Sequence, residues 1–246
     1  MMRLKLRSLR EGGLDSVLLG LVLALLLSGC ATPAVPYDRA ASKIRTIGVL
    51  TPSFPQGAGA HLATTVGQSF GLIGMMVDAG LKSRRDATLN QLLSSQGFVV
   101  QDQFTPRLMT ALQNAGYAVS TVPLARAGAG FVPKYPASGA GEIQAYLDIL
   151  VLDYGYVAAG IGSSTPYRPR VQLTARLVNA ADSSVLMQDA IAYNPVNALG
   201  PAITIPPDPE PQFVDFDALT TRPDAAAAGL RVAVNKSADA LAALLQ

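Results

Sequence analysis

The residue with the most distinctive chemistry in this sequence is Cys30, the only cysteine among 246 residues. It ends the run Leu27-Ser28-Gly29-Cys30, in which one aliphatic and two small residues precede the thiol. An apolar segment, Val17 to Leu27, leads into this run and follows a basic start carrying Arg3, Lys5, Arg7 and Arg10. This layout is typical of a secretory signal peptide. The apolar segment is shorter than the roughly 20 residues that a membrane-spanning helix needs. The pattern therefore predicts export followed by cleavage.

The four residues ending at Cys30 match the lipobox of bacterial lipoproteins. In that family the cysteine thiol receives a diacylglyceryl group, the chain is cut before the cysteine, and the new amino group is acylated. The resemblance implies a signal peptide over residues 1–29, lipidation at Cys30 and the membrane as a partner. Stable anchoring needs more than one acyl chain, at about 0.8 kcal/mol per buried methylene, and a triacylated cysteine meets that need. The alternative is a buried cysteine at the end of an uncleaved apolar helix.

The residue after the cysteine gives an expectation for localisation. Ala31, rather than an aspartate, follows Cys30. By resemblance to enterobacterial lipoproteins, this implies export to the outer membrane, where the protein would face the periplasm.

Other residues that could do chemistry do not form a recognisable active site. His61 is the only histidine and falls in a glycine-rich stretch, so we expect it to be solvated rather than catalytic. With no second histidine and no free thiol, we expect no metal site. The sequence has no GxSxG motif and no phosphate-binding loop, so we expect no cofactor. Asp148 and Asp153 lie five apart on one predicted strand, which would point them to opposite sides. We therefore predict that the protein is not an enzyme.

Charge excludes one class of partner. Residues 1–29 hold four of the 19 basic and two of the 17 acidic residues, so cleavage leaves 15 of each in a chain of 217. A balanced chain has no basic surface to recruit nucleic acid or anionic lipid. The remaining length is enough for one sizeable core.

Hydrophobic patterning predicts one domain over residues 43–246, behind a lipidated tether over residues 30–42 that is extended because of Pro33 and Pro36. Strands are expected near 44–50, 117–124, 146–158, 171–178 and 185–193, and helices near 86–95, 105–116 and from Pro223 onward. The apolar run Ile149 to Leu152 predicts burial on both faces, so its strand is expected to be central in the sheet. Residues 179–184 are expected to form the turn between the last two strands. Thr105 and Pro106 are expected to begin the second helix. Tyr154, Tyr156 and Tyr167 are expected to pack locally. The fold class is thus α/β (α+β), a single mixed sheet with helices mainly on one face.

Residues 62–81 form an unusual glycine-rich apolar segment with one charge, Asp78. Gly67 and Gly71 make a GxxxG pattern, which lets helices approach closely in an apolar setting. Membrane contact or self-association is one interpretation. We favour packing on the domain's own core, because each glycine costs about 1 kcal/mol inside a helix and a free-standing helix is then unfavourable.

The order of elements resembles the α/β domain shared by the amino-terminal part of TolB and the curli-secretion lipoproteins. Three pieces of sequence carry this resemblance: the strand Ile47-Gly48-Val49-Leu50, the helix with Phe104, Leu108 and Leu112 running into Gly116-Tyr117, and the stretch Ala175 to Asp182. The usual glycine of the last turn is replaced by Ser183 or Ser184. The curli-secretion proteins form pores with long membrane hairpins, and this sequence has no pair of long alternating hairpins.

These observations predict a non-catalytic binding or accessory module of the cell envelope, with another envelope protein or a second copy as its partner. The alternative is a self-assembling subunit of an outer-membrane export or pore complex, for which residues 62–81 are the direct support.

Overall fold

The computed structural model describes residues 33–63, 71–126, 128, 130–136, 142–160, 164–196, 198 and 200–246, and for residues 71–78 it describes the backbone alone. Cys30, the predicted signal peptide and Gly67 lie outside the described residues. Pro33 to Gln246 form one structural unit. Its elements, in chain order, are α2 (Arg39–Ser42), β1 (Thr46–Leu50), β2 (Gly59–Leu62), α3 (Gly71–Ser95), α4 (Val100–Asn114), β3 (Ala118–Val122), β4 (Ala145–Ala158), β5 (Arg168–Asn179), β6 (Val185–Tyr193), β7 (Ile203–Ile205), α5 (Phe216–Thr220) and α6 (Pro223–Ala243).

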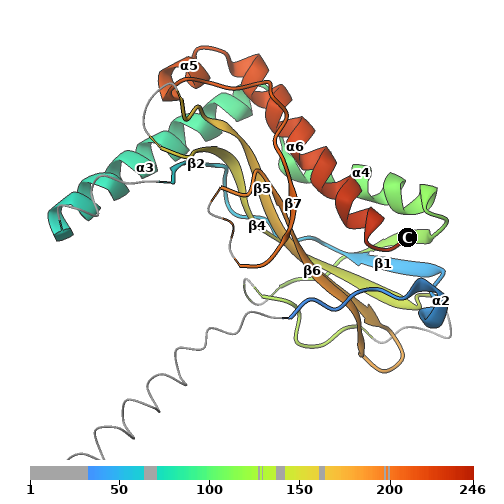
Figure 1. The fold of residues 1–246 in the computed structure, drawn as a ribbon. Helices are drawn as coiled ribbons and strands as arrows, with labels where there is room; N and C mark the ends of the chain where they lie inside the picture. Colours follow the sequence, from blue (N-terminus) through green and yellow to red (C-terminus); the bar gives the residue numbers. More distant parts are fainter. Residues whose placement is uncertain are drawn as a thin grey trace, which may run out of the picture. The chain divides into compact units, whose positions relative to one another are not determined.

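The strands form one mixed sheet in the order β3-β1-β4-β5-β6-β7, with β2 pairing to β4 beyond the end of β1 (Figure 1). Strands β4, β5 and β6 are antiparallel, whereas β1, β2, β3 and β7 each pair in parallel with their neighbours. The long strand β4 is central, as its apolar sequence predicted, because β1 and β2 share one of its edges and β5 occupies the other. The predicted fold class is confirmed.

The main core lies between one face of this sheet and helices α3, α4 and α6 (Figure 1). Alternate residues of β4, including Leu147, Ile149 and Tyr156, point into it and are fully buried. The predicted stripe of α6 is buried there too, at Leu230, Val234, Leu241 and Leu245. The Tyr156 hydroxyl donates to the Ala226 carbonyl over 2.6 Å, which ties β4 to α6. Burial raises the pKa of Tyr156 well above its ordinary value. Tyr154 and Tyr167 are also buried, and Tyr156 and Tyr167 pack edge-on against Phe213 and Phe216, so these tyrosines pack in the core.

No described helix packs against the opposite face of the sheet, which we call the helix-free face. A second, smaller core of Leu50, Val132 and Tyr146 covers one end of it. Val132 belongs to the loop of residues 123–136, which follows β3 and, through Val132, packs on Leu50 and Tyr146 of the sheet. Tyr135 of this loop stacks on Tyr146 with ring centres 6.1 Å apart. A loop, rather than a helix, therefore shields this end of the face.

The amino-terminal segment is docked on the domain rather than free. The Val35 amide donates to the Gln188 carbonyl over 2.7 Å, and the Gln188 amide donates back over 2.9 Å. Further along, the Arg39 guanidinium donates to the Ala115 carbonyl and lies over the Tyr117 ring. The described part of the expected tether, residues 33–42, is therefore not a free extended chain, because backbone pairing and a capped turn, α2, hold it.

Helix α4 begins at Val100, so the prediction that Thr105 and Pro106 begin it is wrong. Val100 and Phe104 are buried beside Leu108 and Leu112 on the same helix face. Burying a side chain such as Val or Phe contributes about 1.5–3 kcal/mol. Two such side chains together offset the cost of about 3 kcal/mol for a proline inside a helix.

Helix α3 is longer than the predicted 86–95, since it starts at Gly71. Every described side chain from Ala79 to Arg84 is exposed, and burial in the core begins only at Leu89. For residues 79–81 the expectation of packing on the domain's own core is therefore wrong. Among the described residues, no helix combines the length and the apolarity that crossing a bilayer requires.

Candidate functional site

A β-bulge determines which polar side chains meet on the helix-free face. The register between β4 and β5 shifts between Val151 and Asp153, so that Asp148 pairs with Arg176 and Asp153 with Gln172. Arg176 and Gln172 are four residues apart on β5 and share one face. Asp148 and Asp153 therefore lie on the same face, and the prediction of opposite sides is wrong. The extra residue, Leu152, is left exposed. A bulge of this kind is not visible in the alternation of a single strand.

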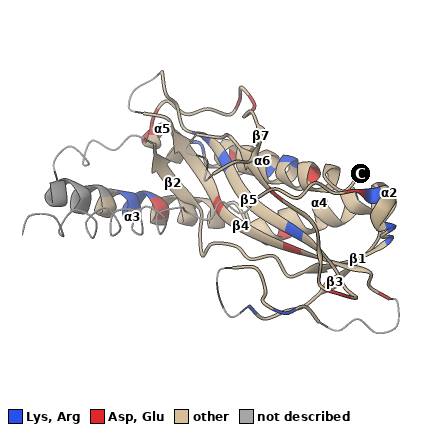
Figure 2. Cartoon of the chain, turned by 60° about the horizontal axis from the view of Figure 1, so that its bottom comes forward, with Lys and Arg blue, Asp and Glu red and all other residues tan. Residues whose placement is uncertain are grey.

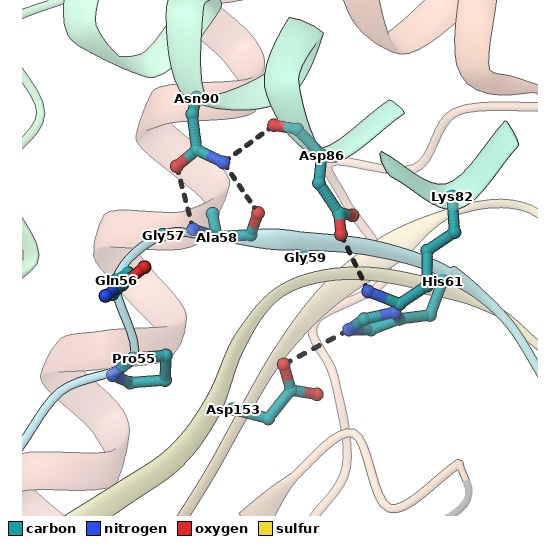
Figure 3. Close-up of a pocket in the computed structure, with 10 residues that line it drawn as sticks. All are labelled: Pro55, Gln56, Gly57, Ala58, Gly59, His61, Lys82, Asp86, Asn90 and Asp153. Carbon is teal, nitrogen blue, oxygen red and sulfur yellow. Dashed lines mark hydrogen bonds and ion pairs between the residues drawn. The ribbon is translucent and has the colours of Figure 1, made fainter. Parts of the chain in front are cut away.

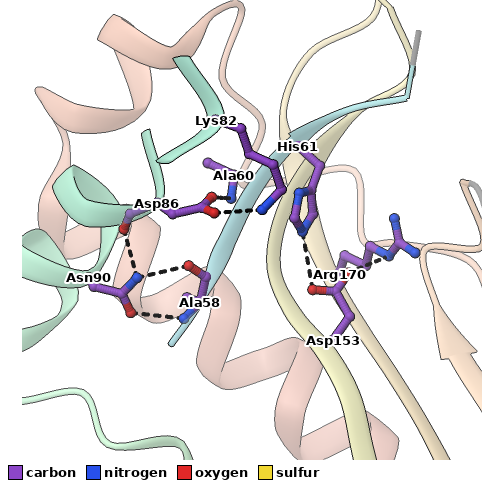
Figure 4. A network of polar contacts seen from close by, with 8 residues as sticks. All are labelled: Ala58, Ala60, His61, Lys82, Asp86, Asn90, Asp153 and Arg170. Carbon is purple, nitrogen blue, oxygen red and sulfur yellow. Dashed lines mark hydrogen bonds and ion pairs between the residues drawn. The ribbon is translucent and has the colours of Figure 1, made fainter. Parts of the chain in front are cut away.

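His61 lies in strand β2 and joins a polar chain with Asp153 and Arg170. Its Nε2 atom is 3.2 Å from Oδ1 of Asp153, and Oδ2 of the same carboxylate is 3.2 Å from Nε of Arg170 (Figure 4). The side chain of Arg170 is 8% exposed, and those of His61 and Asp153 are 24% and 22% exposed. Burial lowers the pKa of Arg170, against the opposing effect of Asp153. The expectation of a solvated histidine in a loop is therefore wrong.

Two glycines make room for this contact. A Cβ on Gly59 would fall 2.2 Å from Nε2 of His61, so the imidazole lies directly over that residue. A Cβ on Gly155 would fall 2.0 Å from the Gly59 carbonyl oxygen, and the Gly155 φ of +140° also disfavours a side chain. The glycine-rich stretch before His61 is therefore a strand that must approach β4 closely.

Side chains of helix α3 form hydrogen bonds with the backbone along the edge of β2 that faces away from β4. The Asn90 carboxamide accepts from the Ala58 amide over 2.8 Å and donates to the Ala58 carbonyl over 2.9 Å, as a neighbouring peptide group would (Figure 3). One turn earlier, Oδ1 of Asp86 accepts from the Ala60 amide over 2.7 Å. Its Oδ2 accepts from Lys82 over 2.7 Å. These side chains satisfy backbone groups that a second strand would otherwise pair.

Between β2 and α3 lies an open pocket of about 460 Å³, lined by Pro55, Gln56, Gly57, Ala58, Gly59, His61, Lys82, Asp86, Asn90 and Asp153. His61 of β2 and Lys82 of α3 both line this pocket (Figure 3). None of these ten lining residues carries a hydroxyl or a thiol that His61 could activate. Among the described residues there is also no group of three His, Cys, Asp or Glu side chains placed to hold a metal. The arrangement therefore works as a clamp on β2 beside a polar pocket.

Replacing Asn90 with alanine should lower the free energy of unfolding by about 1–3 kcal/mol, because both backbone groups of the buried Ala58 would lose their partner. Thermal unfolding of the full-length protein in detergent measures this loss. Alanine at the exposed neighbour Gln91 is the matched control and should change little. Equal melting temperatures for the two variants would contradict the role of Asn90.

A second ion pair lies at the other end of the helix-free face. The Arg126 guanidinium donates to Oδ1 of Asp148 over 2.6 Å, and Oδ2 accepts from the Val132 amide over 2.9 Å. Arg126 also donates to the Thr51 carbonyl. This pair fixes the loop of residues 123–136 on the sheet and leaves no free carboxylate for chemistry. Sequence reasoning had assigned no role to Arg126.

Comparisons with known proteins give likenesses of fold. No protein-family model matches the sequence, and no curated protein matches it. A Xanthomonas campestris protein of the DUF330 family is similar in structure, with a TM-score of 0.40 and 12% identity over 86% of each chain. The PelC dodecamer of Paraburkholderia phytofirmans is similar with a TM-score of 0.38 and 10% sequence identity, over 87% of this chain and 95% of that chain. The lipoprotein GNA1162 of Neisseria meningitidis is similar with a TM-score of 0.22 and 16% sequence identity, over 60% of this chain and 81% of that chain. At these values the likenesses carry no conclusion about function.

Proposed function

We propose that this chain is a lipid-anchored lipoprotein of the bacterial cell envelope that acts as a non-catalytic binding or accessory module in the periplasm. Residues 1–29 are its signal peptide, Cys30 carries the lipid, and the outer membrane holds it. The proposal rests on the lipobox at Cys30 together with one structural observation. The structural unit that includes the docked amino-terminal segment begins at Pro33. Only Ala31 and Thr32 therefore separate this unit from Cys30 in the sequence.

The geometry of the pocket supports a binding role over a catalytic one. The polar atoms of Asn90 and Asp86 are occupied in holding β2. The carboxylate of Asp153 is held between His61 and Arg170. Catalysis by a His–Asp pair needs a nucleophile or a bound water in reach of the imidazole. The ten lining residues offer no hydroxyl or thiol for that role.

Self-assembly is the second candidate, favoured by the exposed part of α3. Leu81 is 43% exposed there, in a helix whose earlier residues are apolar in sequence. The native mass of the protein in detergent distinguishes the candidates, because a subunit of an export complex forms a ring-sized particle and an accessory module does not.

Replacing Cys30 with alanine should abolish lipidation, because the chain contains no other thiol. Cells that express the variant should incorporate no labelled palmitate into the protein, and any processed protein should leave the membrane fraction. Ser28→Ala is the matched control, since it keeps a small residue in the lipobox and should leave labelling intact. Labelled palmitate in the Cys30→Ala protein would overturn the proposal.

A further inference from the structure

The amino-terminal segment reaches the sheet from its helix-free face. Leu177 and Met187 point into the main core, so their neighbours Arg176 and Gln188 point to the opposite face. The Gln188 side chain accepts from Nε of Arg176 over 2.7 Å and donates to the Pro33 carbonyl over 3.3 Å. Pro33 therefore lies beside a side chain of the helix-free face.

Beyond Pro33 the segment crosses the edge of the sheet. Val35 pairs with the backbone of Gln188 on the edge of β6 opposite β5, the edge that β7 joins further along. Tyr37, two residues later, packs against the main core on the helix side. The chain thus passes from the helix-free face at Pro33 to the helix-covered face at Tyr37. Pro33, the first described residue of the segment, therefore lies on the helix-free side.

The reach of the anchor is short. Three peptide units separate the Cα atoms of Cys30 and Pro33, and they span at most about 11 Å when fully extended. We propose that the helix-free face is the membrane-facing surface of the anchored protein and lies against the lipid headgroups of the bilayer that holds Cys30. This inference rests on the lipidation proposed above.

The chemistry of the face suits a headgroup layer. Two of the exposed aliphatic side chains, Leu152 and Val185, belong to it. The Arg176 guanidinium lies 4.3 Å from the ring centre of Phe131, which gives an aromatic and cationic pair of the kind that favours a membrane interface.

The charge of the face is also suitable. The loop that starts after β3 carries Arg126 and the exposed Lys134, and residues 124–141 include no acidic residue (Figure 2). The carboxylates of Asp148 and Asp153 are each paired with an arginine. The two carboxylates that β4 places on this face are therefore neutralised by adjacent arginines and present no unpaired charge to anionic lipids.

Two single-cysteine variants test this orientation. Leu152 on the helix-free face is 41% exposed, and Val232 on α6 is 40% exposed, so labels at the two sites start from matched environments. Because Cys30 is blocked by lipid in the processed protein, the introduced cysteine is the only free thiol. Processed Leu152→Cys and Val232→Cys proteins are labelled with an environment-sensitive fluorophore. They are then reconstituted in phosphatidylethanolamine–phosphatidylglycerol vesicles containing a headgroup-nitroxide lipid.

The label at position 152 should lose most of its emission on these vesicles, and the label at position 232 should keep its emission. Val185→Cys, at 39% exposure, provides a second site with the same expectation as position 152. If the protein does not float with the vesicles, the proposed lipidation fails. If it floats and the labels at 152 and 185 are quenched no more than the label at 232, the orientation is overturned.

Discussion

Replacing Arg126 with methionine should lower the free energy of unfolding by about 3–5 kcal/mol, because it leaves the buried carboxylate of Asp148 without its cationic partner. The side chains of Arg126 and Asp148 are 10% and 0% exposed, and their closest atoms are 2.6 Å apart. The remaining donors to Asp148, the Val132 amide and the Tyr135 hydroxyl, are neutral groups from the same loop. We therefore expect the loss of Arg126 to release this loop from the sheet as well.

Two further variants make this prediction specific. Lys134→Met removes an exposed cation from the same loop and should change stability by less than about 0.5 kcal/mol. Asp148→Asn combined with Arg126→Met leaves no buried charge at these two positions, so the double variant should be more stable than Arg126→Met alone. Chemical denaturation of the full-length protein in detergent measures all three. A double variant no more stable than the Arg126→Met protein would show that the buried charge is not the cause.

The predictable part of this fold is the part that local sequence controls. Alternating apolar residues identified β5, and the continuous run Ile149 to Leu152 identified β4 as the central strand, although Leu152 itself is exposed. The turn between β5 and β6 followed from Asn179 and Asp182, whose side chains accept from the Ala181 and Ser184 amides. Each of these signals depends on residues close together in the chain.

The features that escaped prediction depend on contacts between distant residues. Strand β2 has only four residues and contains a glycine, and it is held by Asn90 and Asp86 from a helix about 30 residues away. The bulge at Leu152 moves Asp153 to the face of Asp148, which reverses what simple alternation predicts. The sequence shows His61 and Asp153 only as isolated residues. The pairing of β2 with β4 and the bulge at Leu152 bring these two side chains together.

Replacing Gly155 with alanine should lower the free energy of unfolding by about 2–6 kcal/mol, from overpacking and backbone strain together. The added Cβ would lie 2.0 Å from the Gly59 carbonyl oxygen and 2.7 Å from its nitrogen, so β2 could not keep its present distance from β4. Gly160→Ala is the matched control near the end of the same strand. Its Cβ would meet Thr165 at 3.6 Å, an ordinary contact, and its stability should be nearly unchanged.

The single histidine makes the structural consequence of Gly155→Ala measurable. His61 lies two residues after Gly59 in β2, and its imidazole contacts Asp153 across the same strand pair. If β2 moves away from β4, the imidazole loses this carboxylate, and its one pair of ring resonances in an NMR spectrum should shift toward those of a solvated histidine. Amide exchange at Ala60 should accelerate as well, because its hydrogen bond to Asp86 requires a docked β2. Unchanged histidine resonances together with an unchanged melting temperature would show that the close approach of Gly59 and Gly155 does not hold the clamp.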